Sequence, residues 1–211
     1  SSYGRYDRHI RYKPDGTPRS AEWNYGPQKW MMNQLTIKHN KKNVMYDSFV
    51  LRLAHQYFNE SRIDRSMNSA TRRIRDEKVQ ALSLNPDWIK QITEKHTLYY
   101  GLEAVVNDVK SSGTDEDIVN KVTVAGPSRY PDAVWSSWAA YLNYRFNISQ
   151  KVSISAGARY NHYVLNADFT ANTPFYPLPA ALVSLNKGSV NGSLGVVYSP
   201  TDKWALSLNL A

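Results

Sequence analysis

Apolar and polar residues alternate along much of this chain of 211 residues. The clearest run places Trp138, Ala140, Leu142, Tyr144 and Phe146 at every second position, and the residues between them are mostly polar. Successive side chains of a β-strand point to opposite faces, so a period of two predicts a strand with one apolar and one polar face.

The same alternation predicts an all-β fold of about eight strands. They cover residues 29–39, 44–59, 77–86, 95–107, 134–147, 152–169 and 189–198, and a last strand begins at Trp204. Several are longer than the roughly 5–6 residues typical of soluble strands. They reach the roughly 9–11 residues that a tilted strand needs to cross a bilayer.

The connections between these strands alternate between short and long. The short ones, at residues 40–43, 87–94, 148–151 and 199–203, are rich in turn-forming residues, whereas residues 60–76, 108–133 and 170–188 form long links. The stretch up to Gln28 would belong to another long loop. In outer-membrane barrels, short turns face the periplasm and long loops face outward. The order therefore predicts a segment of an antiparallel up-and-down transmembrane β-barrel.

Aromatic residues near the ends of the apolar rows agree with this interpretation. Trp138 and Phe146 are eight residues apart, as are Phe49 and Tyr57. That spacing is about 26 Å along a strand, or about 20 Å after a tilt of about 40°, which is close to the ~25 Å apolar band of such barrels. The alternative is a soluble β-sandwich, in which the apolar rows would pack against each other as a closed core.

Composition narrows the class further. There is no cysteine, which excludes disulfide scaffolds, zinc–thiolate sites and cysteine nucleophiles. Mean hydropathy is −0.55, and no stretch approaches the roughly 18 consecutive apolar residues of a transmembrane helix. The net charge is +8, but the basic residues are scattered over loops, turns and one strand face, so no nucleic-acid partner is expected.

The two ends of the chain are unusual for a complete domain. Residues 1–11 are polar and basic, without the apolar core of a signal peptide. The alternating row Trp204, Leu206, Leu208 and Leu210 stops at Ala211 in mid-strand. We interpret the chain as an internal fragment of a longer polypeptide.

Several segments, in order, resemble bacterial TonB-dependent outer-membrane receptors, notably those of Bacteroidetes. They are residues 21–30 (AEWNYGPQKW), 57–65 (YFNESRIDR), 100–103 (YGLE), 129–132 (RYPD), 156–162 (AGARYNH), and 195–198 followed by Trp204. Each piece alone has little specificity, but together they cover nearly the whole chain.

This resemblance implies a barrel of about 22 strands filled by an N-terminal plug, in the bacterial outer membrane. Such receptors import iron–siderophore complexes, haem, cobalamin or similar nutrients, and an inner-membrane TonB complex supplies the energy. Residues 1–211 would be part of the barrel, without the plug domain or the C-terminal strands. The implied partners are the plug, the TonB complex, outer-membrane lipid and lipopolysaccharide, and a small nutrient. The barrel is expected to be monomeric and to need no cofactor.

The polar rows give the candidate lumen-lining residues, for ligand passage or plug contact. They are Arg52, Gln56, Glu103, Tyr141, Asn143, Arg145, Arg159 and Asn161. The alternative for each is an ordinary hydrated interior, which every such barrel needs. Arg52, Glu103, Arg145 and Arg159 are also expected to pair across neighbouring strands.

A second set of candidates lies in the expected outer loops. Arg72, Arg73 and Arg75 cluster with Lys78, and the set also includes Arg129 and Tyr130. Arginine and lysine bind phosphate and carboxylate oxygens well, so these side chains would contact lipopolysaccharide phosphates or an anionic ligand. The alternative is a solvated loop without a specific partner.

Two other function classes compete with a transporter: a soluble all-β binding module and an outer-membrane barrel enzyme. An outer-membrane protease would need acids and a histidine at the outer rim, for which Asp64, Asp132 and His162 are the available residues. No histidine has the spacing of a zinc site, so no metal site is expected. His9, with Tyr3, Tyr6 and Tyr12 nearby, raises the hypothesis of a haem contact, against plain loop exposure. We predict a transporter, and no catalytic residue.

Overall fold

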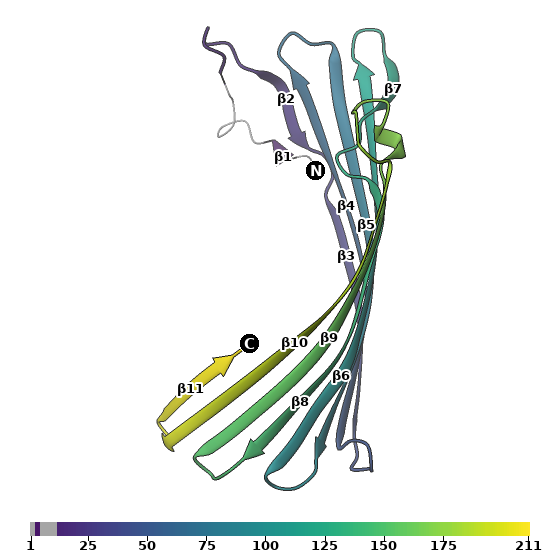
Figure 1. Ribbon diagram of the computed structural model, residues 1–211. Helices are drawn as coiled ribbons and strands as arrows, with labels where there is room; N and C mark the ends of the chain where they lie inside the picture. The colour runs from purple at the N-terminus through teal and green to yellow at the C-terminus, as the bar shows by residue number, and fades with distance from the viewer. Residues whose placement is uncertain (1–2, 5–11) are drawn as a thin grey trace.

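The computed structural model describes residues 3–4 and 12–211, which form one antiparallel sheet of 11 strands. The strands are β1 (Tyr3–Gly4), β2 (Ser20–Tyr25), β3 (Lys29–Asn40), β4 (Ser48–Ser66), β5 (Thr71–Gln91), β6 (His96–Asp117), β7 (Val122–Gly126), β8 (Asp132–Asn147), β9 (Val152–Asp168), β10 (Leu182–Thr201) and β11 (Trp204–Leu210), with one 3-10 turn, η1 (Thr170–Asn172). Figure 1 shows this single layer curving so that β10 and β11 come round toward the viewer, like part of a cylinder wall.

At two places in the wall, next to β4 and next to β6, two strands follow one another along a single neighbour. β2 pairs with residues 62–66 at one end of β4, and β3 pairs with residues 48–59 of the same strand. Likewise, β7 pairs with residues 113–117 of β6, and β8 pairs with residues 96–109. Pro27 follows the first strand of one pair, and Pro127 and Pro131 separate the strands of the other. Proline has no backbone N–H to donate to the ladder, so each pair is one strand interrupted at proline.

All eight predicted strands are present, and the fold class is confirmed. The extent of the long links was wrong. β4 and β5 continue through residues 60–76 and leave only a turn at 67–70, β6 and β7 occupy much of 108–133, and β10 begins at Leu182. Residues 20–25, expected to lie in a loop, form β2. The extensions of β4, β5 and β6 carry polar residues on both faces, so the alternation of apolar and polar residues does not show there.

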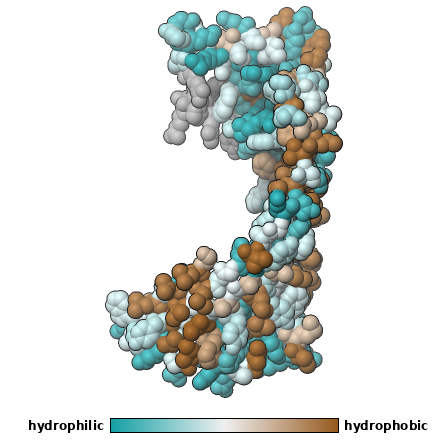
Figure 2. Space-filling model, viewed as in Figure 1, coloured by the Kyte–Doolittle hydropathy of each residue, from teal (hydrophilic) through white to brown (hydrophobic). Residues whose placement is uncertain are grey.

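The register separates the two faces of the sheet. Paired residues share a face, so the outer face carries the apolar rows, with Leu35, Leu53, Leu84, Leu102 and Leu142 among them. The other face is largely polar and lies inside the curve. Figure 2 shows hydrophobic side chains gathered where β10 and β11 come forward, and mainly hydrophilic ones at the upper end of the wall.

The outer face has a defined apolar band. Near the short turns, Phe49, Trp88 and Tyr100 form a row, with ring centroids 5.4 Å apart at each step. Ten residues farther along each strand lies a polar row, Asn59, Lys78 and Lys110, joined by the ladder to Lys29. Ten residues span about 33 Å, or about 25 Å at a tilt of about 40°, which matches the hydrocarbon-facing band of outer-membrane barrels. On β3 to β6, Asn33, His55, Gln80 and Asp108 are polar exceptions within it.

The alternative of a soluble sandwich is wrong for the described residues. Their buried hydrophobic residues are only Ala139 and Ala167, and none of their side chains is fully buried. Leu35 is 54% exposed and Leu206 61%. The apolar rows therefore face outward instead of forming a dry core between two sheets. No helix among the described residues is long and apolar enough to cross a membrane.

Beyond the apolar band, ion pairs between charged side chains connect neighbouring strands on the outer face. Glu22 on β2 pairs with Arg65 on β4 at 3.0 Å and with Arg72 on β5 at 2.7 Å. Arg72 also reaches Glu116 on β6 at 3.2 Å. Hydrogen bonds from Arg72 and Arg65 hold the pKa of the Glu22 carboxyl below its ordinary value, against the opposing effect of burial.

On the inner face, one glycine lets a side chain cross a whole strand. The Tyr141 ring on β8 lies over Gly101 on β6, and a Cβ at position 101 would overlap that ring. The Tyr141 hydroxyl donates to Asp87 Oδ1 on β5 at 2.5 Å, and Asp87 also forms an ion pair with Arg52 on β4. This contact links four adjacent strands.

Replacing Gly101 with alanine should destabilise the barrel. The added methyl group has to displace the Tyr141 ring, which breaks its bond to Asp87, at a cost of about 1–3 kcal/mol for overpacking. The measurement is urea unfolding of the full-length protein in detergent. The matched control is Gly192→Ala, where the nearest neighbour of a Cβ is the Gly157 carbonyl oxygen at 3.8 Å; it should change stability by no more than about 0.5 kcal/mol. Equal effects of the two substitutions would contradict the proposed crossing.

The Glu22 cluster should make stability depend on pH. Its carboxyl has a lower pKa folded than the ordinary 4.5, so it stabilises the fold above that pH and loses this effect as the pH falls through the folded pKa. Glu22→Gln should therefore lower the urea midpoint at neutral pH, and the gap to the unmodified protein should close in acid. Glu94→Gln, at an exposed turn position, is the control. A gap that stays constant with pH would show that the carboxylate charge does not stabilise the fold.

Candidate functional site

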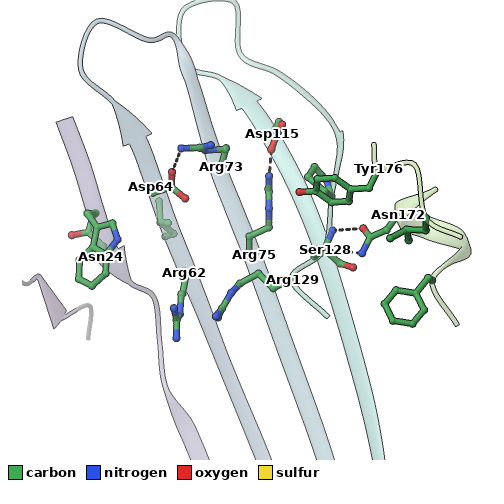
Figure 3. A pocket seen from close by; sticks show the side chains of 15 residues that line it. Asn24, Arg62, Asp64, Arg73, Arg75, Asp115, Ser128, Arg129, Asn172 and Tyr176 are labelled. Carbon is green, nitrogen blue, oxygen red and sulfur yellow. Dashed lines mark hydrogen bonds and ion pairs between the residues drawn. The ribbon is translucent and has the colours of Figure 1, made fainter. Parts of the chain in front are cut away.

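A pocket of about 730 Å³ lies at the outer end of the wall, above the apolar band. Arg62 and Asp64 on β4, Arg73 and Arg75 on β5, and Asp115 on β6 all point from the inner face of the sheet into it. Its other walls come from β2, from residues 127–129 between β7 and β8, and from the loop between β9 and β10. Figure 3 shows these side chains from close by.

The interruption between β7 and β8 builds one wall of the pocket. Gly126 and Gly113 pair directly, and a Cβ at position 113 would overlap the Pro127 carbonyl. The chain can therefore leave the ladder at Pro127 and pass close over the inner face before β8 begins at Asp132. This detour brings Ser128 and Arg129 to the pocket.

Asn172 fixes that detour to the loop that follows β9. Its side-chain oxygen accepts a hydrogen bond from the Ser128 backbone N–H at 2.8 Å, and its amide donates to the Ser128 carbonyl at 3.2 Å. Asn172 is only 5% exposed, and the 3-10 turn η1 places it. Two bonds to one residue make this wall a defined surface instead of a free loop.

The four arginines of the pocket are not equivalent. Arg73 forms an ion pair with Asp64. Arg75 binds Asp115 at 2.8 Å and donates to the Ile74 and Thr114 carbonyls. In Figure 3 these two point toward their acidic partners, whereas Arg62 and Arg129 extend together toward the lower part of the view.

Arg62 and Arg129 have only loose acidic neighbours. Arg62 Nε lies 3.5 Å from Glu60 Oε1, and Arg129 Nη1 lies 3.9 Å from Glu60 and 3.7 Å from Glu77. Arg62 Nε is buried and has no hydrogen-bond partner in the structure. Each guanidinium instead lies over an aromatic ring, Arg62 on Tyr25 at 4.9 Å and Arg129 on Tyr130 at 5.0 Å.

The residues predicted as outer-loop contacts lie on different faces of the sheet. Arg73, Arg75 and Arg129 meet at the pocket, but Arg72 and Lys78 point from the other face of β5. Tyr130 lies at the edge, where its hydroxyl accepts from Arg129 at 3.3 Å. The expectation that this set lies in loops was wrong for Arg72, Arg73 and Arg75, which are part of β5.

Sequence reasoning missed most of the pocket lining, including Arg62, Asp115, Ser128 and Asn172. Arg62 lies in the quoted segment YFNESRIDR, whose alternate residues Glu60, Arg62 and Asp64 share the inner face. That period of two was the available signal. For Ser128 and Asn172 there was none, because only the fold brings together residues 44 positions apart.

The eight predicted lumen residues all lie on the inner face of the sheet, below the pocket. Arg159 reaches Glu103 across β8 at 3.1 Å and donates to Asn161 at 2.6 Å. Arg52 and Tyr141 meet at Asp87, which was not among the predicted residues.

The remaining lumen candidates are more separate. Arg145 lies over the Tyr99 ring at 5.4 Å, Asn143 is paired with Gly157, and Gln56 is paired with Ala81. Arg145 therefore contacts an aromatic ring where a cross-strand acidic partner had been expected. Arg52 is ten positions before Arg62 on β4, about 33 Å deeper along the strand, so the lumen candidates and the pocket are separate groups.

The residues considered for a protease do not converge. Asp64 pairs with Arg73 on the inner face, and Asp132 binds Lys110 and the Ser111 N–H. His162 is paired with Trp138, six positions along β8 from Asp132, or about 20 Å. Among residues 12–211, no group of three or more His, Asp or Glu side chains could hold a metal. His9 and Tyr6, considered for haem, lie outside the described residues.

Comparison with known structures gives the same fold. The "Copper transporter OprC" superposes with a TM-score of 0.70 at 12% identity, over 85% of this chain and 29% of that one. The ferric citrate transporter FecA, in its unliganded form, superposes with a TM-score of 0.61 at 15% identity, over 92% of this chain and 28% of that one. The ferric yersiniabactin uptake receptor FyuA from Yersinia pestis superposes with a TM-score of 0.57 at 15% identity, over 92% of this chain and 29% of that one. The chain thus spans less than a third of each of these proteins.

No curated protein sequence matches the chain. The family model described as "TonB dependent receptor-like, beta-barrel" matches residues 1–211. Proteins of this family are found in the bacterial outer membrane, which agrees with the apolar band on the outer face. The chain therefore belongs to the TonB-dependent receptor-like β-barrel family.

Proposed function

We propose that the full-length protein is an outer-membrane receptor that takes up a small nutrient with energy from the TonB complex. The observation that carries this proposal is the pocket near Arg62 and Arg129, on the inner face of a family barrel wall and above its apolar band. A ligand captured there would be on the outer side of the membrane, at the entrance to the lumen.

The mechanism follows from this placement. The pocket would capture the nutrient, a plug domain inside the barrel would rearrange, and the nutrient would pass the polar inner face. The cluster of Glu103, Arg159 and Asn161 and that of Arg52, Asp87 and Tyr141 lie along this route. They would either contact the nutrient or hold the plug, and outer-membrane lipid would cover the apolar face.

Iron–siderophore complexes, haem and cobalamin-like compounds are the proposed nutrients. Two of the similar structures are named for ferric citrate and ferric yersiniabactin, and a third is named for copper. These names describe those proteins, but they support a scarce metal-containing nutrient over a sugar or a peptide. A protease is the weaker alternative, because Asp64, Asp132 and His162 lie apart.

Deleting the gene should abolish growth on one limiting nutrient and leave growth on an excess of it unchanged. The measurement is growth of the deletion strain with single iron chelates, haem or cobalamin, each supplied at a limiting concentration, and uptake of the radiolabelled compound that fails. Reintroducing the gene should restore growth and uptake, and a brief collapse of the membrane potential should stop uptake of the radiolabelled compound, because energy comes from the inner membrane.

Growth of the deletion strain on every compound tested would contradict uptake of these nutrients. Hydrolysis of a basic peptide by the purified full-length protein would instead favour the protease.

A further inference from the structure

We infer that the outer pocket recognises an oxyanion of its ligand, a carboxylate or phosphate, through the Arg62 and Arg129 guanidinium groups. The inference rests on the proposed uptake function, but it names a ligand chemistry and two residues that the family match does not give. It is argued from the charges, hydrogen bonds and ring contacts of the pocket.

The charge of the lining favours an anion. Four arginines and two aspartates face the cavity. Both aspartates are already bound, Asp64 by Arg73 and Asp115 by Arg75. The opposite charges cancel within each of these two ion pairs, so the positive charge presented to a ligand comes from Arg62 and Arg129.

Arg129 already donates one hydrogen bond, from Nη2 to the Tyr130 hydroxyl at 3.3 Å, and the remaining donors of the two guanidinium groups are available to a ligand. Neither guanidinium is within 3.4 Å of a carboxylate oxygen of Glu60 or Glu77, and Arg62 Nε is buried without a partner. A buried donor without a partner costs free energy, which a ligand oxygen would recover. Guanidinium groups bind carboxylate and phosphate in pairs of parallel hydrogen bonds, so they suit this ligand class.

The arginines are also held in place before a ligand arrives. The Tyr25 ring supports Arg62, and the Tyr130 ring supports Arg129. Asn172 fixes the backbone next to Arg129 through its two bonds to Ser128. Arginine side chains that are ordered in advance lose less conformational entropy on binding, which favours affinity.

Glu60 and Glu77 do not take the place of a ligand oxyanion at Arg62 and Arg129. They do not line the cavity, and the side chain of Glu77 is only 6% exposed. At 3.5 to 3.9 Å they attract the arginines without occupying their donors. Trp23, Phe169 and Tyr176 form part of the remaining lining, so the rest of the ligand would meet aromatic surface.

The test uses citrate as a carboxylate probe on the purified full-length protein. Phenylglyoxal modifies arginine, and peptide mass spectrometry gives the rate at each site. Citrate should slow modification of Arg62 and Arg129 at least about threefold, because it occupies their donors. Glycerol, a neutral compound, should not slow it, and exposed Arg19 should react equally in all conditions. Repeating the experiment with phosphate in place of citrate shows whether a phosphate or a carboxylate protects the site better.

Variants give the second measurement. Arg62→Gln and Arg129→Gln should each weaken citrate binding, measured by calorimetry, by roughly tenfold or more, the effect of losing a hydrogen bond to a charged group. Arg19→Gln should bind citrate like the unmodified protein. Urea unfolding of all three variants shows whether any loss comes from misfolding.

Unchanged modification rates with both anions, or full-strength binding in the Arg62→Gln, Arg129→Gln double variant, would overturn the inference. Protection by citrate in a protein that takes up no nutrient would overturn the proposed transport function and leave the oxyanion site standing. Nutrient uptake by a protein whose arginines citrate and phosphate do not protect would overturn the oxyanion site and leave the proposed transport function standing.

Discussion

Backbone hydrogen bonding in a membrane is the constraint on which the rest of this structure depends. Hydrocarbon offers no partner for an N–H or C=O group, so strands that cross it must pair along their whole length. The β4–β5 ladder joins 17 consecutive residue pairs, and the β5–β6 ladder keeps the same register on both sides of a gap at residues 85–86. Because the register is continuous, one alternation of side chains sets both faces of the wall from end to end.

Outside the bilayer the same strands carry a different chemistry. Below the row of Asn59, Lys78 and Lys110 the outer face is mainly apolar, whereas above it both faces carry charges. Ion pairs such as Glu22 with Arg72 connect strands on one face, and Arg75 with Asp115 connects strands on the other. The strand extensions thus form a charged rim that carries one side of the pocket, and residues 127–129 and the loop after β9 complete it.

Interruptions of the ladder shape that pocket. The break at Pro27 and the break between Pro127 and Pro131 lie on opposite sides of the three continuous strands β4, β5 and β6, and at about the same height. Gly26 donates to the Ser61 carbonyl, and Ser61 is joined through Asp76 to Ser112, next to Gly113. Missing proline donors are tolerated there because water is available above the apolar band. The chain can therefore turn over the inner face and bring Arg129 beside Arg62.

The alternation of residues and the lengths of the connections determined the strands and their antiparallel order. Together with the aromatic residues near the row ends, they indicated the outward direction of Leu35 and Leu142 and the inner face for Arg52 and Arg159. Alternation is a local property of the sequence. It did not determine how far β4, β5 and β6 extend, because alternation disappears where both faces are wet. Only the tertiary structure separated Arg72 from Arg73, and brought Asp87 to Tyr141 and Asn172 to Ser128. These contacts depend on strand register and on a detour of the chain, and neither can be read from the spacing of residues along one strand.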